Sequence, residues 1–359
     1  MKTVQRISNW SYYLVLLPIA ILIAGWQGWS WWSWASSPPA AATSSSSEGE
    51  TAVQIQIPPG TGAQQIGKDL EAAGIIRSAQ AWKLWTYWLL MQNRDGEYKA
   101  GTYKLSPTKP LPAIADKIWT GEVMQLSFTI PEGWSLQQMA TYFESLGYFK
   151  AEDFIAAASQ IPRQEFPWLP PDIPHLEGYL YPDTYQLPSD RISAPQIIQQ
   201  MLKRFEQVAL PLYQQAQGKT QLSFTQWVTL ASLVEKEAAV AAERPLIAGV
   251  FTARLQRGMK MESDPTVEYG LGIKQTADRP LTFAQVKIPS PYNTYLNPGL
   301  PPTPIAAPGV ESLKATLNPE STDYLFFVAR YDGTHVFSKT LAEHQAATVA
   351  IRRQRQSQQ

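Results

Sequence analysis

Cysteine is absent from the 359-residue sequence, which excludes disulfides, thiolate nucleophiles and thiolate metal sites. Histidine is scarce, and the three that occur, at 175, 335 and 344, form no His-Glu-x-x-His pattern. We therefore expect no metal site and no cofactor. A surplus of charge is also missing, since 30 Lys and Arg balance 30 Asp and Glu. A nucleic-acid partner is not expected, because phosphate binding requires a basic surplus.

The N-terminal region combines positive charge with a long apolar run. Lys2 and Arg6 precede apolar residues from about Tyr12 to Gly25, and a tryptophan cluster follows at positions 26–34. Together they span roughly 20 residues, the length that crosses a bilayer. The cluster resembles an interfacial aromatic belt, and the positive end should stay in the cytoplasm. A cleaved signal peptide is the alternative, but this run is long for one and a tryptophan-rich flank is a poor cleavage site.

We therefore expect residues 1–35 to form a cytoplasmic N-terminus and a single-pass membrane anchor, with the bulk of the chain outside the cytoplasm. Residues 36–50 are rich in Pro, Ala and Ser, a composition that cannot build a core. They are predicted to be a flexible linker that lets the folded part reach away from the membrane.

Two segments after the linker repeat the order strand, Pro-Gly turn, amphipathic helix and helix-stopping glycine. They begin at Val53 and Leu126 and stay in register over about 20 residues. The first continues through a tryptophan-rich helix, a strand at 101–105 and a helix at 111–120. This strand–helix–helix–strand unit resembles a LysM module, a fold that binds N-acetylglucosamine polymers; a small α+β packing domain without a ligand fits the spacing equally well. We expect the LysM-like module at 51–125 and a second strand–helix subdomain at 126–160.

The stretch Leu230-Ala-Ser-Leu-Val-Glu-Lys-Glu237 places an acid on a helix face of small and apolar residues. The helix should begin near Phe224, capped by Ser223 or Thr225. Water solvates a carboxyl group poorly on such a face, so Glu235 could serve as a general acid near neutral pH. Glu237 is expected to be solvated at the helix end. The alternative is that Glu235 is an ordinary surface glutamate, because buried carboxylates are rare.

Helical and turn-rich segments flank this stretch. Long helices are predicted at 194–217 and 239–258, which would complete a helical lobe. Asp264 precedes a proline, so it should be extended and cap the following turn. A hairpin at 324–338 and a helix at 341–352 close the chain. Long irregular loops between these elements are expected to be functional.

Six phrases then occur in a fixed order. They are Leu176-Glu-Gly-Tyr-Leu-Tyr-Pro-Asp-Thr-Tyr185, Leu230-Ala-Ser-Leu-Val-Glu-Lys-Glu237, Asp264-Pro-Thr-Val267 with Tyr269, Ser290-Pro-Tyr-Asn-Thr-Tyr295, Gly299-Leu-Pro-Pro302 and His335-Val-Phe-Ser338. The set resembles the YceG-like (MltG-type) family of endolytic murein transglycosylases, from about Val53 to His344 and including the anchor. Thr303 stands where the family usually has glycine, which leaves the local loop shape open. The alternating tyrosines of the first phrase could either line a cleft or pack in a core.

The resemblance implies an α+β chain with an N-terminal transmembrane helix, a LysM-like module and a mixed α/β catalytic domain with a helical lobe. The catalytic domain would cover 126–352 and leave 353–359 as a disordered tail. The family's catalytic glutamate falls on Glu235. The candidate substrate-binding residues, chosen by polarity and place in the phrases, are Glu177, Tyr181, Asp264, Thr266, Tyr269, Asn293 and Tyr295.

The implied activity is cleavage of the bond between N-acetylmuramic acid and N-acetylglucosamine in nascent peptidoglycan. Glu235 would protonate the glycosidic oxygen, and the muramic C6 hydroxyl would then attack C1 to give a 1,6-anhydro end. A lysozyme-like hydrolase, with Asp264 or Glu177 as a second carboxylate, is one alternative; a non-catalytic wall-binding scaffold is another. The expected location is the bacterial cytoplasmic membrane with the catalytic domain on its outer, periplasmic side, and cell-wall synthases are candidate partners.

Overall fold

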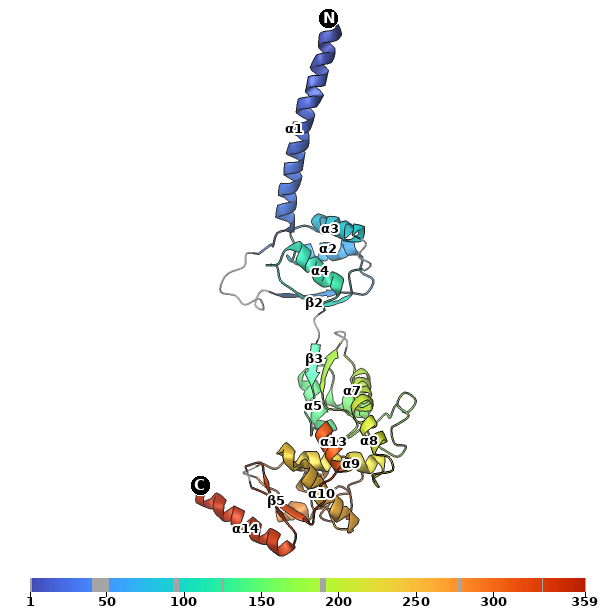
Figure 1. The fold of residues 1–359 in the computed structure, drawn as a ribbon, viewed down its shortest axis with the longest axis vertical. Coiled ribbons are helices and arrows are strands. Elements are labelled where there is room, and N and C mark those ends of the chain that lie inside the picture. The colour runs from blue at the N-terminus through green and yellow to red at the C-terminus, as the bar shows by residue number, and fades with distance from the viewer. Residues whose placement is uncertain are drawn as a thin grey trace. The chain divides into compact units, whose positions relative to one another are not determined.

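The computed structural model describes residues 2–40, 52–92, 97–123, 126–187, 192–276, 279–330 and 332–358, and Figure 1 colours them along the chain. They form two compact units: Met1–Leu126 with Leu187–Asp190, and Ser127–Gln186 with Arg191–Gln359. Helices are combined with two-stranded sheets, so the mixed helix-and-sheet class is confirmed. Residues 41–50 of the expected linker lie outside the described residues.

Helix α1 (Lys2–Ser36) contains the segment that we expect to be the anchor. Its segment Val15–Ser36 has a mean hydropathy of 1.2 and is long and apolar enough to cross a membrane. Its C-terminal end packs on the first module, where Ala35 is 0% exposed and Trp32 stacks on Trp85 with 6.0 Å between ring centroids. The span and the first module therefore share a core.

The residues directly after α1 are held against the first module. The Ala40 N–H donates to the Pro107 carbonyl at 3.1 Å, and Arg77 Nε donates to the Pro38 carbonyl at 3.0 Å. The prediction of a flexible linker from residue 36 is therefore wrong for residues 36–40. The aromatic packing of α1 on the module and these hydrogen bonds fix the chain there.

The first module has every element that the sequence predicts. It consists of β1 (Val53–Ile57), α2 (Ala63–Ala72), α3 (Ala79–Met91), β2 (Gly101–Leu105) and α4 (Leu111–Thr120). The two strands are antiparallel, with Val53 opposite Leu105 and Ile57 opposite Gly101. Apolar side chains at helical spacing on α2 and α4 meet Trp82 of α3 in one core, because residues three or four apart share a helix face.

The predicted repeat is also confirmed. In the second unit, β3 (Leu126–Thr129) and α5 (Leu136–Ser145) follow the order of β1 and α2. The turn glycines Gly60 and Gly133 have φ of 79° and 75°, a left-handed conformation that glycine adopts without a Cβ penalty. The matched core positions Leu70 and Phe143 are each 0% exposed. Helix α6 (Ala151–Ala158) packs on α5, and β4 (Thr184–Leu187) pairs with β3.

The helical lobe departs from prediction at two places. The single helix expected over 194–217 is wrong, because α7 (Ala194–Val208) ends before Ala209 and α8 (Leu210–Ala216) follows as a separate helix. Pro211 lacks the N–H that a continuous helix would need there, but it is tolerated in a first turn. The helix expected from 239 begins later, as α10 (Arg244–Gln256) after a 3-10 turn η1 (Ala241–Glu243), since Pro245 also favours a first turn.

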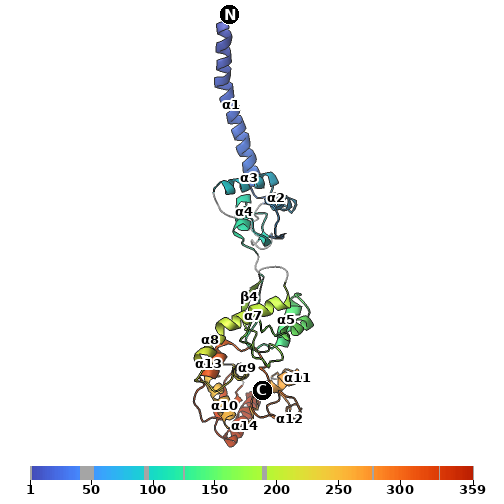
Figure 2. The same cartoon turned by 90° about the vertical axis from the view of Figure 1, so that its right-hand side faces the viewer.

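Helix α9 (Phe224–Glu237) lies among α10, α11 (Asp264–Leu271) and α13 (Val310–Leu317), all of which contact it (Figure 2). The remaining elements are α12 (Phe283–Val286), β5 (Phe326–Ala329), β6 (His335–Ser338) and α14 (Leu341–Gln358). The predicted hairpin is confirmed by the antiparallel β5–β6 pair. Asp264 is the first residue of α11 rather than its cap. The disordered tail expected from 353 is helical to Gln358, because the segment contains strong helix formers and neither Gly nor Pro.

Candidate active site

Helix α9 carries the candidate acids on its last turn. It begins with the expected cap: the Ser223 side chain accepts from the Gln226 N–H, and the Gln226 side chain accepts from the Ser223 N–H, a reciprocal capping box. Its middle is fully buried, and Trp227 Nε1 donates to the Leu313 carbonyl of α13 at 3.0 Å. Ser232 Oγ accepts from the Ile305 N–H at 3.1 Å, which holds the proline-rich loop on α9. The helix end is thus rigidly placed.

Glu235 is buried, but among polar groups. Its side chain is 6% exposed and lies 3.3 Å from Arg244 Nη2. Its other oxygen accepts from the Gly309 N–H at 3.0 Å, and Gly309 is the N-cap of α13. Both partners are polar N–H donors, so both carboxyl oxygens of Glu235 are hydrogen-bonded. The apolar surroundings expected for Glu235 are therefore wrong, and Glu235 lines neither of the two cavities described below.

Glu132 joins this ion pair from the second repeat. Its Oε2 lies 3.9 Å from Arg244 Nη2, and a Cβ on Gly309 would stand 2.0 Å from its carboxylate. Burial raises the pKa of Glu132, the charges of Glu235 and Glu311 raise it further, and Arg244 opposes them. The cluster of Glu132, Arg244 and Glu235 connects the turn after β3 to the end of α9.

Glu237, two residues further on, has the raised pKa that was expected for Glu235. Ser263 Oγ donates to Glu237 Oε1 at 2.6 Å, and the side chain lines a cavity. Burial raises the pKa of Glu237 to about 7; the Ser263 hydrogen bond and Lys236 oppose the shift, and the charges of Asp264 and Glu268 add to it. The expected solvated helix end is therefore wrong. The segment after α10 covers this carboxyl group, which is poised between its protonated and ionised forms at neutral pH.

The cavity beside Glu237, here the second cavity, has a volume of about 840 Å³. Asp264 and Tyr295 line it with Glu237 and Glu268. The Tyr295 hydroxyl donates to Asp264 Oδ1 at 2.7 Å, which fixes that carboxylate. Two of the predicted substrate-binding residues therefore lie with Glu237 in one hollow. Immediately before them, Glu262 has φ of 51°, an uncommon backbone conformation for a side chain of this size.

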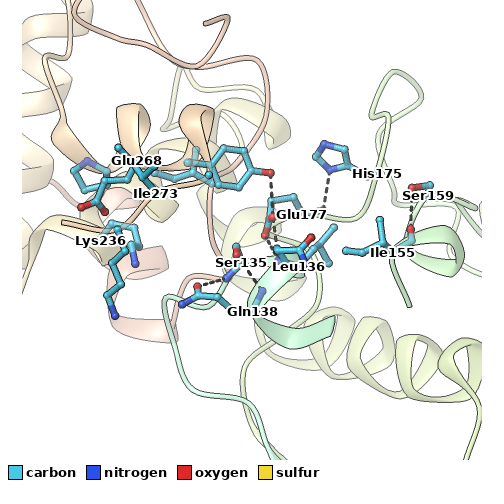
Figure 3. A pocket seen from close by; sticks show the side chains of 16 residues that line it. Ser135, Leu136, Gln138, Ile155, Ser159, His175, Glu177, Lys236, Glu268 and Ile273 are labelled. Carbon is cyan, nitrogen blue, oxygen red and sulfur yellow. Dashed lines mark hydrogen bonds between the residues drawn. The ribbon is translucent and has the colours of Figure 1, made fainter. Parts of the chain in front are cut away.

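The first cavity has a volume of about 630 Å³ and is lined by Glu177, Tyr269, His175 and Lys236, among others (Figure 3). Glu177 accepts from the Leu136 N–H at 3.0 and 3.1 Å and from the Tyr269 hydroxyl at 3.1 Å. Burial raises the pKa of Glu177 to about 7, against these hydrogen bonds and the charge of Lys236. Figure 3 shows Glu177 reaching toward α5 and Lys236 at the far side of the hollow.

The two cavities adjoin. Lys236, Pro265, Glu268 and Lys274 line both of them. The end of α9 and the start of α11 therefore form the divide between two hollows of one groove. An elongated polymer suits a groove of this kind better than a compact ligand does, because successive units can occupy successive hollows.

The other three predicted substrate-binding residues lie in the interior. Thr266 is 0% exposed and bonds the Ser263 carbonyl and the Thr294 hydroxyl. Asn293 donates to the Val286 and Ile288 carbonyls at 2.8 and 2.9 Å, so it shapes its own loop. Tyr181 is 6% exposed and packs against Phe205. None of the three lines either cavity.

The comparisons with known proteins place this geometry in a family. The sequence model of the YceG-like family matches residues 55–350. An endolytic murein transglycosylase of Bacillus subtilis (strain 168) is 35% identical over 314 residues, covering 84% of this chain and 85% of the relative. The chain belongs to the YceG-like family.

Other YceG-like relatives agree with this assignment. An endolytic murein transglycosylase of Streptococcus pneumoniae (strain D39) is 32% identical over 77% of this chain and 54% of its own length, so the chain spans about half of that relative. A 2.6 Å crystal structure of a yceG-like protein from Listeria monocytogenes matches with a TM-score of 0.57 and 34% identity, over 82% of this chain and 99% of that chain. The family match, over 55–350, includes nearly all of the first module, the whole lining of the first cavity, most of that of the second and all the acids described above.

Sequence reasoning named Arg244 and Glu243 as possible charge partners of a neighbouring segment, and they pair with Glu235 and His335. It missed Glu132, Ser263 and the burial of Glu237. One signal for Glu132 was present: the first repeat turns through Pro58-Pro59-Gly60, whereas the second has Pro131-Glu132-Gly133, an acid in place of a proline. Glu237 gave no such signal, because Ser263 and Asp264 reach it from 26 residues further along the chain.

Proposed function

We propose that this chain is a membrane-anchored endolytic murein transglycosylase that cuts nascent peptidoglycan strands and terminates their elongation. The relatives that carry this name support the class of reaction. The observation that carries the chemistry is Glu237, a carboxyl group with a pKa of about 7 at the edge of a groove. A general acid works best when its pKa lies near the working pH.

The general acid in this proposal is Glu237 rather than Glu235. Glu235 is bound to Arg244 and to the Gly309 N–H at the start of α13, and it lines neither of the two cavities. Glu237 has one neutral hydrogen-bond donor, Ser263, and faces the second cavity. Glu235 then acts as a positioning residue that fixes the end of α9 against α10 and α13.

The reaction proceeds from the protonated acid. Glu237 gives its proton to the oxygen that links muramic C1 to the next sugar, and the C1–O bond breaks with an oxocarbenium-like centre at C1. The C6 hydroxyl of the same sugar attacks C1, and the Glu237 carboxylate takes the hydroxyl proton. The product carries a 1,6-anhydro ring, and the acid returns to its starting form. Because the nucleophile is part of the substrate, its effective concentration is high and no water is needed.

The residues around Glu237 support the two charge states it passes through. Asp264, held by Tyr295 at 2.7 Å, is the nearest candidate to stabilise positive charge at C1. Lys236 lies between the cavities and favours the ionised form of Glu237 after proton transfer. Tyr269, fixed by Glu177, offers an aromatic surface in the first cavity against which a sugar ring packs.

A matched pair of variants tests this assignment. Glu237→Gln should lower the rate of cleavage of purified, uncrosslinked glycan strands by about 10²–10⁴-fold, whereas Glu235→Gln should retain more activity when it is folded. Cleavage is measured by mass spectrometry of the fragments, with circular dichroism to check folding. Full activity of Glu237→Gln would refute its role as the acid, and a folded but inactive Glu235→Gln would return that role to Glu235.

A lysozyme-like hydrolase is the second candidate, and Asp264 favours it. A retaining or inverting glycosidase uses a second carboxylate near the acid, and Asp264 lines the same cavity as Glu237. The end group of the fragments separates the two reactions: an anhydro-muramic end supports the transglycosylase, and a reducing end supports the hydrolase. A wild-type chain that binds glycan without cutting it would instead support a wall-binding scaffold.

The finer organisation belongs to the same proposal. The first module, with its strand–helix–helix–strand order, is proposed to be LysM-like and to bind glycan, and the N-terminus of α1 is proposed to face the cytoplasm. The second unit would then act on the outer side of the cytoplasmic membrane, near cell-wall synthases. To test the LysM-like role, chitin oligosaccharides are titrated into the full chain carrying an inactivating substitution of the acid. NMR chemical-shift changes at residues of the first module would report binding there.

A further inference from the structure

Helix α3 is apolar on two opposite faces. One face is buried in the first module, with Trp82 at 0% exposed. The other face carries four side chains at the i, i+3, i+4, i+7 spacing of an apolar helical stripe. These residues, here called the outer stripe, are exposed by 51, 54, 44 and 83% in the order Leu84, Tyr87, Trp88 and Met91. An ordered apolar stripe of this size on a surface marks a contact site.

The outer stripe continues into the anchor helix. Trp32 of α1 stacks on Trp85 at 6.0 Å, and Trp85 stacks on Trp88 at 4.3 Å. On α1 itself, Trp26 and Trp29 are exposed by 72 and 73%. A continuous aromatic surface therefore runs from the apolar span onto α3. Both Figure 1 and Figure 2 show α3 at the end of α1 from which the module begins.

The length of α1 determines where this aromatic surface would lie relative to the hydrocarbon boundary of a bilayer. The apolar run starts at about Tyr12 in the sequence, and about 20 helical residues cross the hydrocarbon core. The boundary then falls near Trp31, next to the contact between Trp32 and α3. Tryptophan and tyrosine are the side chains that favour this interfacial level.

We propose that the outer stripe of α3 lies in the interfacial region of the lipid bilayer and seats the first module on the membrane surface; this rests on the proposed membrane anchoring of α1. The aromatic and aliphatic side chains of the stripe would lie at the boundary between the lipid headgroups and the acyl chains. Lys83 is exposed on the same helix, 5.9 Å from the Tyr87 ring, where its ammonium group meets lipid phosphates while its stem stays apolar. The occupant is lipid, because lipid that surrounds Trp29 on the span also reaches Trp88.

The absence of cysteine makes a clean test available. The full chain carrying Met91→Cys is labelled with an environment-sensitive fluorophore and reconstituted in nanodiscs that contain phosphatidylglycerol and a headgroup-proximal spin-labelled lipid. The matched control is Lys104→Cys, an exposed position on β2. We expect quenching of the label at 91 to exceed that at 104 by about threefold or more, and its emission to shift to the blue, as for an interfacial helix.

A second variant separates the stripe from the anchor. Leu84→Glu with Trp88→Glu, in the Met91→Cys background, changes only exposed side chains and leaves α1 to hold the chain in the nanodisc. Quenching at 91 should fall to the level seen at 104. Equal quenching at 91 and 104 in the parent chain overturns the proposal. A label that is shielded from water but not quenched by lipid identifies a protein or glycan occupant and also overturns it.

The test is independent of catalysis. Glycan cleavage by the second unit depends on Glu237, whereas the quenching depends on α3, so either can fail alone. A chain that does not enter nanodiscs at all contradicts the anchor and the docked stripe together.

Discussion

Two glutamates two residues apart on α9 have opposite surroundings. Glu235 meets a guanidinium and a helix N-terminus, and Glu237 meets a hydroxyl group and two neighbouring carboxylates. The sequence located the helix and its acidic end correctly. It ranked Glu235 as the acid and Glu237 as a solvated helix end. The octet that contains both acids did not show their partners, because these come from other segments: Arg244 and Gly309 for Glu235, Ser263 and Asp264 for Glu237.

In the proposed mechanism, the pH dependence of cleavage follows from the pKa of Glu237. The acid must carry its proton at the start of the reaction, so kcat/KM should be nearly constant below about pH 7 and fall about tenfold per pH unit above it. Initial rates on uncrosslinked glycan between pH 5 and pH 9 measure this. A rate that rises through the same range would indicate that the ionised carboxylate starts the reaction.

Glu177 makes a prediction about stability. Its pKa is about 7 in the fold but near 4.5 when the chain is unfolded, so the folded chain binds more protons between these values. Stability therefore falls as pH rises from about 4.5 to 7, by up to about 3 kcal/mol. Glu177→Gln removes this loss, and its free energy of unfolding relative to wild type should improve by that amount from pH 5 to pH 8. Denaturant titrations at both pH values measure this, with Glu152→Gln at an exposed position as the control. If the stability difference between Glu177→Gln and wild type is the same at pH 5 and pH 8, Glu177 does not titrate as a buried acid.

At the scale of elements, most of the fold was readable from the sequence. Alternating strands, turn glycines and helical spacing in the two repeats each describe local geometry, and the structure follows them to within a residue or two. The failures are at two helix boundaries in the helical lobe. The break at Ala209 and the late start of α10 both involve a proline that is tolerated in a first turn and excluded from a helix interior, and the pattern of apolar residues does not distinguish those positions.

At Gly249, in the middle of α10, substitution by alanine is expected to destabilise the fold rather than stabilise it. Replacing a mid-helix glycine by alanine usually stabilises a helix by about 1 kcal/mol. A Cβ at this position would stand 2.2 Å from the Glu320 carbonyl oxygen. The same residue is held to α10 by a hydrogen bond from its N–H to the Pro245 carbonyl. Gly249→Ala should therefore destabilise the second unit by about 1–3 kcal/mol. Thermal melts decide the sign, and a higher melting temperature would show that the 320 segment moves freely.

At the scale of the whole molecule, the anchor helix belongs to the core of the first module. A chain shortened to begin at Gly28 keeps Trp32 and Ala35 and should retain the module's stability. A chain shortened to begin at residue 41 loses both, exposes Trp85, and should lose about 2 kcal/mol through uncovered apolar surface. Hydrogen exchange of α3 and β2 in the two shortened chains measures the difference. Equal protection would mean that α1 contributes nothing to the module.

The docking of α1 on α3 also links the lipid environment to protein orientation. A transmembrane helix that is joined to its domain by a flexible linker can tilt in the bilayer without changing the orientation of that domain. Here the last turn of α1 is clamped by ring stacking and by Arg77, so a lean of the helix rotates the first module with it. Transmembrane helices lean more in thinner bilayers. If α1 spans the membrane as proposed, bilayer thickness therefore sets the angle at which the first module is presented.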